Sequence, residues 1–201
     1  MKALYIFFLA IIFSNAVNSQ NQLNPRYVHL NDTTFNGVVE FCLNVNVDSF
    51  RYGETLVPIL AIDTNRLELN VDSMKEVIFY NFWFTSCSPC IAEMPMLDTL
   101  VKLYHDKVDF ISITWESEDK LKLFLKDNQF NFRHFLVSKK GYLEDIGVVH
   151  GYPTTIITFH NKIVYCKYGG QDSNSIYFEA VNRAERSRYE AILNELVKKI
   201  E

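Results

Sequence analysis

The chain has 201 residues, of which 48% are hydrophobic and 22% are charged, and its formal net charge at pH 7 is −4. This length is enough for one domain of ordinary size with a substantial core. The mildly acidic charge and the lack of a basic block argue against nucleic acids and anionic lipid surfaces as partners.

The first 19 residues have the pattern of a secretory signal peptide. Lys2 gives a weakly basic start, residues 3–13 form an unbroken apolar run, and small residues follow at Ala16 and Ser19. The run is short for a membrane span, although an uncleaved segment that tethers the protein to the membrane is the alternative. We therefore expect an exported protein, in the periplasm or an equivalent extracytoplasmic space, where disulfides persist.

Residues 20–51 are rich in asparagine and contain turn signals. From Val39 to Val47 the apolar residues alternate with the others, which predicts a half-buried strand. A segment this short cannot bury a core of its own. We therefore expect an N-terminal β extension that packs on a single domain of residues 52–201.

Strands and helices alternate along that domain. We expect strands at 57–62, 77–83, 108–114, 132–137, 154–159 and 163–168, and helices from about residue 89, at 117–128 and at 175–200. The last two strands are joined by His160-Asn161-Lys162, which is typical of an antiparallel hairpin. The pattern predicts an α/β fold with a central mixed sheet and helices on both faces.

Cys87 and Cys90 are separated by two residues at the start of the first predicted helix. Unpaired backbone N–H groups and the positive end of the helix dipole favour a thiolate, so Cys87 should be acidic and nucleophilic. Cys90 is close enough to attack a mixed disulfide formed at Cys87 and release the product. We therefore expect a redox-active disulfide between these two residues.

Two other interpretations of the pair were weighed. A zinc site would need a second pair at metal-ligand spacing, but Cys42 and Cys166 stand alone, so we expect no metal. A purely structural disulfide that closes so short a loop would constrain little chain entropy. Both interpretations are weaker than thiol–disulfide exchange.

Three motifs in order resemble the TlpA/ResA-like branch of the thioredoxin superfamily. They are Asn-Phe-Trp at 81–83, the Cys-Ser-Pro-Cys-Ile-Ala-Glu-Met-Pro signature at 87–95, and Gly-Tyr-Pro-Thr-Thr at 151–155. The match runs from about residue 57 to 170. It implies a thioredoxin-like fold and thiol–disulfide oxidoreductase activity. A tryptophan is common directly before the first cysteine in this branch, but here the residue is Ser86.

The resemblance also implies roles for residues outside the cysteine pair. Pro153 is expected to have a cis peptide bond that brings its loop beside Cys87, where Tyr152 could pair in extended fashion with a substrate segment. We place the substrate-binding surface at Trp83, Ser88, Pro89 and Tyr152, with Trp83 packing behind the site.

Glu93 lies on the same side of the predicted helix as Cys90. Asn81 occupies the place where cytoplasmic thioredoxins carry a buried acid, so the resemblance implies that Glu93 exchanges the proton of Cys90 as a partly buried carboxylate. An exposed helical glutamate is the alternative. The catalytic residues expected are therefore Cys87, Cys90, Glu93 and Pro153.

Cys42 and Cys166 both fall in predicted strands. They are either two inert buried thiols or a second, structural disulfide that fastens the N-terminal extension to the hairpin. Cysteine connectivity cannot be read from a sequence, so both alternatives stay open.

We expect an exported monomer that needs no cofactor. The resemblance implies that it reduces specific client protein disulfides. A membrane-borne thiol donor would re-reduce it, and proteins of this type often serve cytochrome c maturation. The alternative is a thioredoxin-fold binding or scaffolding protein without redox turnover. A peroxidase of the peroxiredoxin type is disfavoured, because Thr85 precedes Cys87 by two residues where that motif requires three.

Overall fold

The computed structural model describes residues 53–140 and 151–201. In chain order its elements are β1 (Ile62–Asp63), the 3-10 helix η1 (Val71–Ser73), β2 (Val77–Phe82), α3 (Ser88–Tyr104), β3 (Val108–Thr114), α4 (Glu118–Asp127), β4 (Arg133–Leu136), β5 (Thr154–Phe159), β6 (Lys162–Tyr168) and α5 (Phe178–Ile200). Within these two ranges, no helix has the length and apolar character needed to cross a membrane.

The strands form one mixed sheet in the order β1-β4-β3-β2-β5-β6. Strand β2 pairs in parallel with β3 and antiparallel with β5, and β4 pairs in parallel with β3. Strands β6 and β1 are antiparallel to their neighbours at the two edges. Strand β2 is therefore central, and all six of its residues are buried, as its apolar composition predicts.

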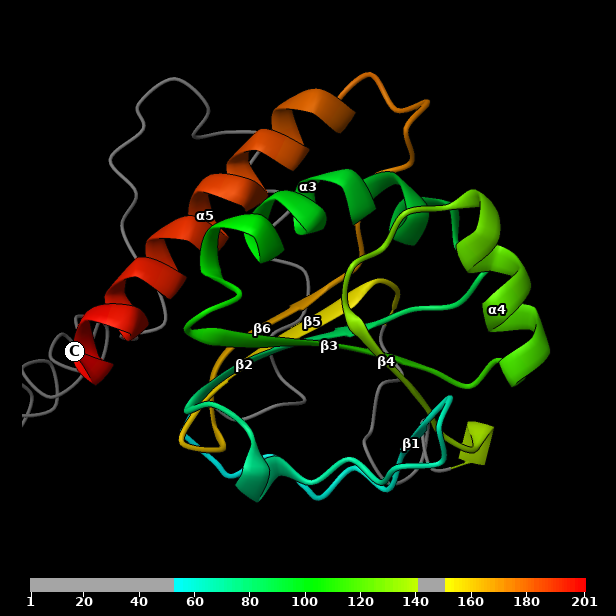
Figure 1. The fold of residues 1–201 in the computed structure, drawn as a ribbon. Coiled ribbons are helices and arrows are strands. Elements are labelled where there is room, and N and C mark those ends of the chain that lie inside the picture. Colours follow the sequence, from blue (N-terminus) through cyan, green and yellow to red (C-terminus); the bar gives the residue numbers. More distant parts are fainter. Residues whose placement is uncertain (1–52, 141–150) are drawn as a thin grey trace, which may run out of the picture. The chain divides into compact units, whose positions relative to one another are not determined.

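Successive residues of β2 point to opposite faces of the sheet and enter two different cores. Val77 and Phe79 pack with residues of α3, α4 and α5, whereas Ile78, Tyr80 and Phe82 pack with residues of the 54–74 segment. Figure 1 shows α3 and α5 on one side of the sheet and the cyan segment that contains η1 on the other. Helical segments thus lie on both faces, but the three α-helices of the described residues share one of them.

Polar side chains cross the sheet in register beneath the α-helices. The strand pairing places His134, Ser112, Asn81, Thr155 and Lys167 directly opposite one another across β4, β3, β2, β5 and β6. Ser112, Asn81 and Thr155 are at most 1% exposed. A buried row of this kind must have its hydrogen-bonding groups satisfied, so it marks the part of the core where chemistry is possible.

Most predicted elements are confirmed to within three residues at each end. The strand predicted at 57–62 is wrong, because only Ile62 belongs to a strand of the sheet. Pro58 has no N–H group for a ladder, and the segment instead buries Leu56, Ile59 and Ala61. The predicted signal peptide and N-terminal β extension lie outside the described residues.

The β5–β6 hairpin is tighter than the sequence suggested. Strand β6 begins at Lys162, so the loop has only His160 and Asn161, and both have positive φ, at 48° and 59°. Two consecutive residues with positive φ are typical of a type I′ turn, whose twist matches that of the strands it joins. The predicted three-residue connection is therefore corrected to two.

Candidate active site

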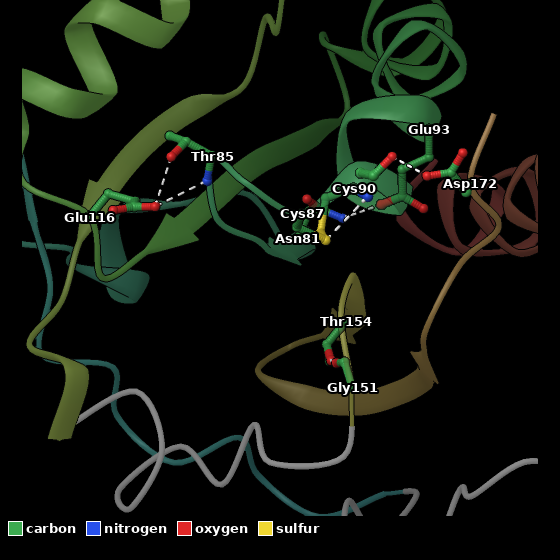
Figure 2. Close-up of a disulfide and its surroundings, with 10 residues drawn as sticks. Asn81, Thr85, Cys87, Cys90, Glu93, Glu116, Gly151, Thr154 and Asp172 are labelled. Atoms are coloured by element: carbon green, nitrogen blue, oxygen red, sulfur yellow. Dashed lines mark hydrogen bonds between the residues drawn. A yellow bond between two sulfur atoms is a disulfide. The ribbon is translucent and has the colours of Figure 1, made fainter. Parts of the chain in front are cut away.

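The cysteine pair lies where central strand β2 gives way to α3. Cys87 is the N-cap of α3, and its Sγ accepts a hydrogen bond from the Cys90 N–H at 3.3 Å. Pro89 stands in the first turn, where its missing N–H leaves no donor unsatisfied. The first turn of α3 therefore directs a backbone donor at the sulfur of Cys87 (Figure 2).

Cys87 and Cys90 are joined by a disulfide, with their Cα atoms 5.2 Å apart. Cys87 is 5% exposed and Cys90 is 1% exposed, so the first cysteine is the one closer to solvent. This difference in exposure suits a two-step disulfide exchange, in which one sulfur attacks the substrate and the other attacks from a buried position.

Trp83 lies directly behind the pair and is fully buried. Its ring packs 4.9 Å from that of Phe124 and 5.5 Å, edge to face, from that of Phe130. A side chain with no exposed surface cannot contact a substrate, so the predicted place of Trp83 in the substrate-binding surface is corrected. It supports the start of α3 from inside the core.

The loop before β5 faces the cysteines. The Tyr152–Pro153 peptide bond is cis, as the resemblance predicted. The Thr154 hydroxyl donates to the Gly151 carbonyl at 2.6 Å, and the Pro153 carbonyl accepts from the Gly169 N–H at 2.7 Å. Figure 2 shows Gly151 and Thr154 on this loop, opposite the disulfide.

Gly170 fills the narrow space between this loop and α3. A Cβ atom at this position would lie 3.0 Å from Cδ of Pro153 and 3.5 Å from Cβ of Pro89. A side chain at this position would therefore require the Pro153 ring to shift.

Three aromatic rings surround the approach to the site. Phe84, Trp115 and Tyr152 contact one another, with ring centroids between 4.9 and 5.3 Å apart. All three are half-buried, so each keeps some surface in contact with solvent. The sequence analysis missed Trp115, although it follows β3, and the carboxyl ends of parallel strands meet at one edge of a sheet.

The polar residues beside the cysteines are held by acids from other segments. The Ser88 hydroxyl donates to the Asp172 carboxylate, and the hydroxyl of Thr85 donates to Glu116 at 2.8 Å (Figure 2). The hydrogen bond from Ser88 lowers the pKa of Asp172. Both acids were missed because they are distant from the cysteines in sequence and belong to no motif.

Glu93 is 5% exposed and points at the polar row of the sheet. The Asn81 side-chain amide donates to its Oε1 at 2.8 Å (Figure 2). Burial raises the pKa of Glu93 to about 7, against smaller opposing effects from Lys167 and the Asn81 hydrogen bond. The exposed helical glutamate is therefore excluded, and a carboxyl group that can gain or lose a proton near neutral pH lies one turn after Cys90.

Cys166 lies on the other face of the sheet, in the core that contains Ile78 and Tyr80. Within residues 53–140 and 151–201 it has no disulfide partner, and burial raises the pKa of its thiol to about 12. Cys42 lies outside the described residues, so the Cys42–Cys166 pairing stays a prediction. In residues 53–140 and 151–201, no cluster of three or more His, Cys, Asp or Glu side chains could hold a metal ion.

Replacing Glu93 with glutamine should change how stability depends on pH. The pKa of Glu93 is raised on folding, so its favourable contribution is complete below about 4.5 and is lost as pH rises through 7. We expect the free energy of unfolding of the wild type to fall relative to Glu93→Gln between pH 5 and 8, by on the order of 3 kcal/mol at most. Urea titrations of the oxidised proteins measure this.

Glu195→Gln, at an exposed position of α5, is the control and should follow the wild type. Parallel stability curves for wild type and Glu93→Gln across this range would contradict the buried, proton-binding carboxyl group.

Gly170→Ala should disturb the site through a direct clash. The new methyl group would press on the Pro153 ring, so we expect a loss of roughly 1–3 kcal/mol in stability and slower reduction of the disulfide by dithiothreitol. Gly169→Ala is the matched control. It introduces the strain of an alanine at a φ of 74°, but its Cβ would meet no atom within 4 Å. Gly170→Ala with wild-type reduction kinetics would show that this contact does not position the site.

Comparisons with known proteins agree with this geometry. The model of the Redoxin family matches residues 57–185. Thioredoxin-like protein YneN from Bacillus subtilis (strain 168) is 34% identical over 97 residues, which are 46% of this chain. The chain covers 56% of the length of that relative.

Two solved structures share the fold at low sequence identity. A Chlorobium tepidum protein assigned as the thiol:disulfide interchange protein DsbE has a TM-score of 0.60 at 19% identity, over 72% of this chain and 99% of its own. A thiol:disulfide interchange protein from Bacteroides sp. has a TM-score of 0.57 at 19% identity, over 72% of this chain and 91% of its own. The family model covers more than half of the chain, and these neighbours confirm the thioredoxin-like fold. The chain therefore belongs to the Redoxin family and has a thioredoxin-like fold.

Proposed function

We propose that the protein is an exported thiol–disulfide oxidoreductase that reduces specific client disulfides with Cys87 and Cys90. The observation that carries this proposal is the position of Cys87 as the N-cap of α3, with the Cys90 N–H directed at its sulfur. A donor at the positive end of a helix stabilises a thiolate in the reduced protein. The low exposure of Cys90 fits a resolving residue that the client does not contact.

The proposed reaction has two steps. The Cys87 thiolate attacks one sulfur of the client disulfide, the client S–S bond breaks, and the second client sulfur leaves as a thiolate that takes a proton from solvent. Cys90 then gives its proton to the Glu93 carboxylate and attacks Cys87 Sγ. The mixed disulfide breaks, the client sulfur leaves as a thiolate that takes a proton from solvent, and the enzyme keeps the Cys87–Cys90 disulfide.

The client-binding surface would consist of Ser88, Pro89 and Tyr152, with Phe84 and Trp115 beside Tyr152. An extended client segment could add main-chain hydrogen bonds next to Tyr152, where the following proline has no N–H group. The three aromatic rings offer an apolar surface for the residues that flank the client cysteine. This aromatic surface takes the place of the tryptophan that commonly precedes the first cysteine in the TlpA/ResA-like branch, where this chain has Ser86.

The direction of exchange, the location and the donor also belong to this proposal. The signal-peptide pattern of residues 1–19 supports export, and a reductant in an oxidising space needs electrons from a membrane-borne thiol donor. The names of the structural neighbours support client disulfides as substrates. Haem-attachment cysteines in cytochrome c maturation are the client class that the resemblance suggests.

Cysteine variants test this function in an insulin-reduction assay with dithiothreitol. We expect Cys87→Ser to reduce insulin no faster than the assay without protein, because the attacking sulfur is gone. Cys90→Ala should accumulate a mixed disulfide with its client, which mass spectrometry identifies. Cys166→Ala is the control and should work like the wild type, since its thiol lies on the other face of the sheet.

If the wild type shows no cysteine-dependent turnover, the protein is instead a binding or scaffolding protein with the same fold. Turnover that persists in Cys87→Ser would contradict the assignment of the nucleophile.

A further inference from the structure

A small cavity lies on the side of Glu93 that faces α5. Glu93, Lys167 and Glu185 line it, together with Gln171 and Asn182. The cavity has a volume of about 10 Å³ and is partly open to solvent, and this volume is close to what one water molecule requires. Neither cysteine lines it, so Glu93 separates the cavity from the disulfide.

An ion pair between β6 and α5 lines this cavity, and Arg188 contacts its acidic member. Lys167 Nζ lies 3.4 Å from Glu185 Oε2, and Arg188 Nη1 lies 3.8 Å from Glu185 Oε1. The side chains of Lys167 and Glu185 are only 13% and 5% exposed. Burying an ion pair removes both charges from water, and the attraction between the charges does not always offset this loss of solvation energy. A contribution to stability is therefore a weak explanation for the buried Lys167–Glu185 pair.

The positions of these residues follow from the fold. A register shift between Ile157 and Thr158 of β5 leaves Val164 of β6 unpaired, so that Tyr165 and Lys167 face the α-helices. Glu185 lies in the buried stripe of α5, one turn from Val181 and one turn from Tyr189. An acid in the middle of an apolar stripe is unusual unless it has a partner or a task.

We propose that Lys167 and Glu185 are positioning residues that tune Glu93 and hold a water path through which its proton reaches solvent beside α5. This inference rests on the proposed function and adds a route for the proton that Cys90 must lose. The cavity lies between the loop after β6 and α5, and Ser88, Pro89 and Tyr152 of the client-binding surface do not line it. Proton release could therefore proceed while a client covers Cys87.

The charges around Glu93 act in opposite directions. Lys167 lowers the pKa of Glu93 and Glu185 raises it, and both effects are added to that of burial. The other groups that face this region are Asn81 from β2, Cys90 from α3, Tyr165 from β6, and Arg188 and Tyr189 from α5. His134 ends the same polar row three strands away from Thr155, and burial lowers its pKa to about 4, so it is neutral at pH 7.

In this proposal the proton moves from Cys90 to solvent in two steps. Cys90 loses its proton to the Glu93 carboxylate as its sulfur attacks Cys87 Sγ. The protonated Glu93 then gives the proton to the water in the cavity, which passes it to solvent and leaves the carboxylate ready for the next cycle. Lys167 and Glu185 orient that water.

Titration of Glu93 in the oxidised protein tests whether Lys167 and Glu185 tune its pKa. The cysteines do not titrate in this state, so carbon-13 NMR of the labelled glutamate carboxyl, assigned with Glu93→Gln, follows Glu93 without turnover. We expect Lys167→Met to raise the pKa of Glu93 and Glu185→Gln to lower it, each by about one unit. Lys199→Met and Glu195→Gln, at exposed positions of α5, are matched controls and should leave it unchanged.

Asn182→Leu tests the path, because the larger apolar side chain would fill the cavity from α5. We expect the mixed disulfide to resolve several-fold more slowly in stopped-flow measurements, with the rate of the first attack on the client unchanged. Equal resolution rates would overturn the path. Shifts of the Glu93 pKa in the same direction in both charge variants, or no shift, would overturn the tuning.

Failure of this inference and failure of the proposed function give different results. A wild type that reduces insulin while the charge and cavity variants behave like it would leave the function and remove the relay. A wild type without cysteine-dependent turnover would remove the function itself, whatever the titration shows.

Discussion

The hydrogen bond from the Cys90 N–H to Cys87 Sγ is the interaction on which the rest of the site depends. It makes a cysteine sulfur the cap of α3 in place of the usual serine or aspartate oxygen. The helix therefore starts at the reactive atom, at the end of the central strand β2. The Pro153 loop, Gly170 and the aromatic rings are all arranged around that starting point.

A second constraint is the buried polar row that crosses the sheet beneath α3 and α5. Because Asn81, Thr155 and Lys167 stand opposite one another on three neighbouring strands, Glu93 meets hydrogen-bonding and charged groups instead of hydrocarbon. The site consequently has two sides. In the proposed mechanism, Cys87 and Tyr152 form the side that meets the client, and Glu93 and the cavity at α5 form the side that exchanges the proton. Dividing these tasks lets sulfur exchange and proton exchange use different surfaces.

Much of this could be predicted from sequence, because the responsible signals are local. The apolar run of β2 and the cysteine spacing predicted this strand, the start of α3 and the Cys87–Cys90 pair. Trp115, Lys167, Asp172 and Glu185 could not be predicted in this way. They reach the site through strand register, a bulge in β6 and helix packing, which join residues that are far apart in sequence. The strand predicted at 57–62 was wrong because an apolar pattern indicates that residues are buried. It does not indicate whether their backbone pairs with a neighbouring strand.

We propose that the fold makes Cys87 the acidic, attacking thiol and Cys90 the protected, resolving one. The most direct measurement is the rate of alkylation of each cysteine in the reduced protein as a function of pH, resolved by peptide mass spectrometry. The account predicts that Cys87 reacts first and titrates well below the ordinary thiol value of about 8.5, while Cys90 titrates above it. Equal labelling of the two thiols, or earlier labelling of Cys90, would contradict it.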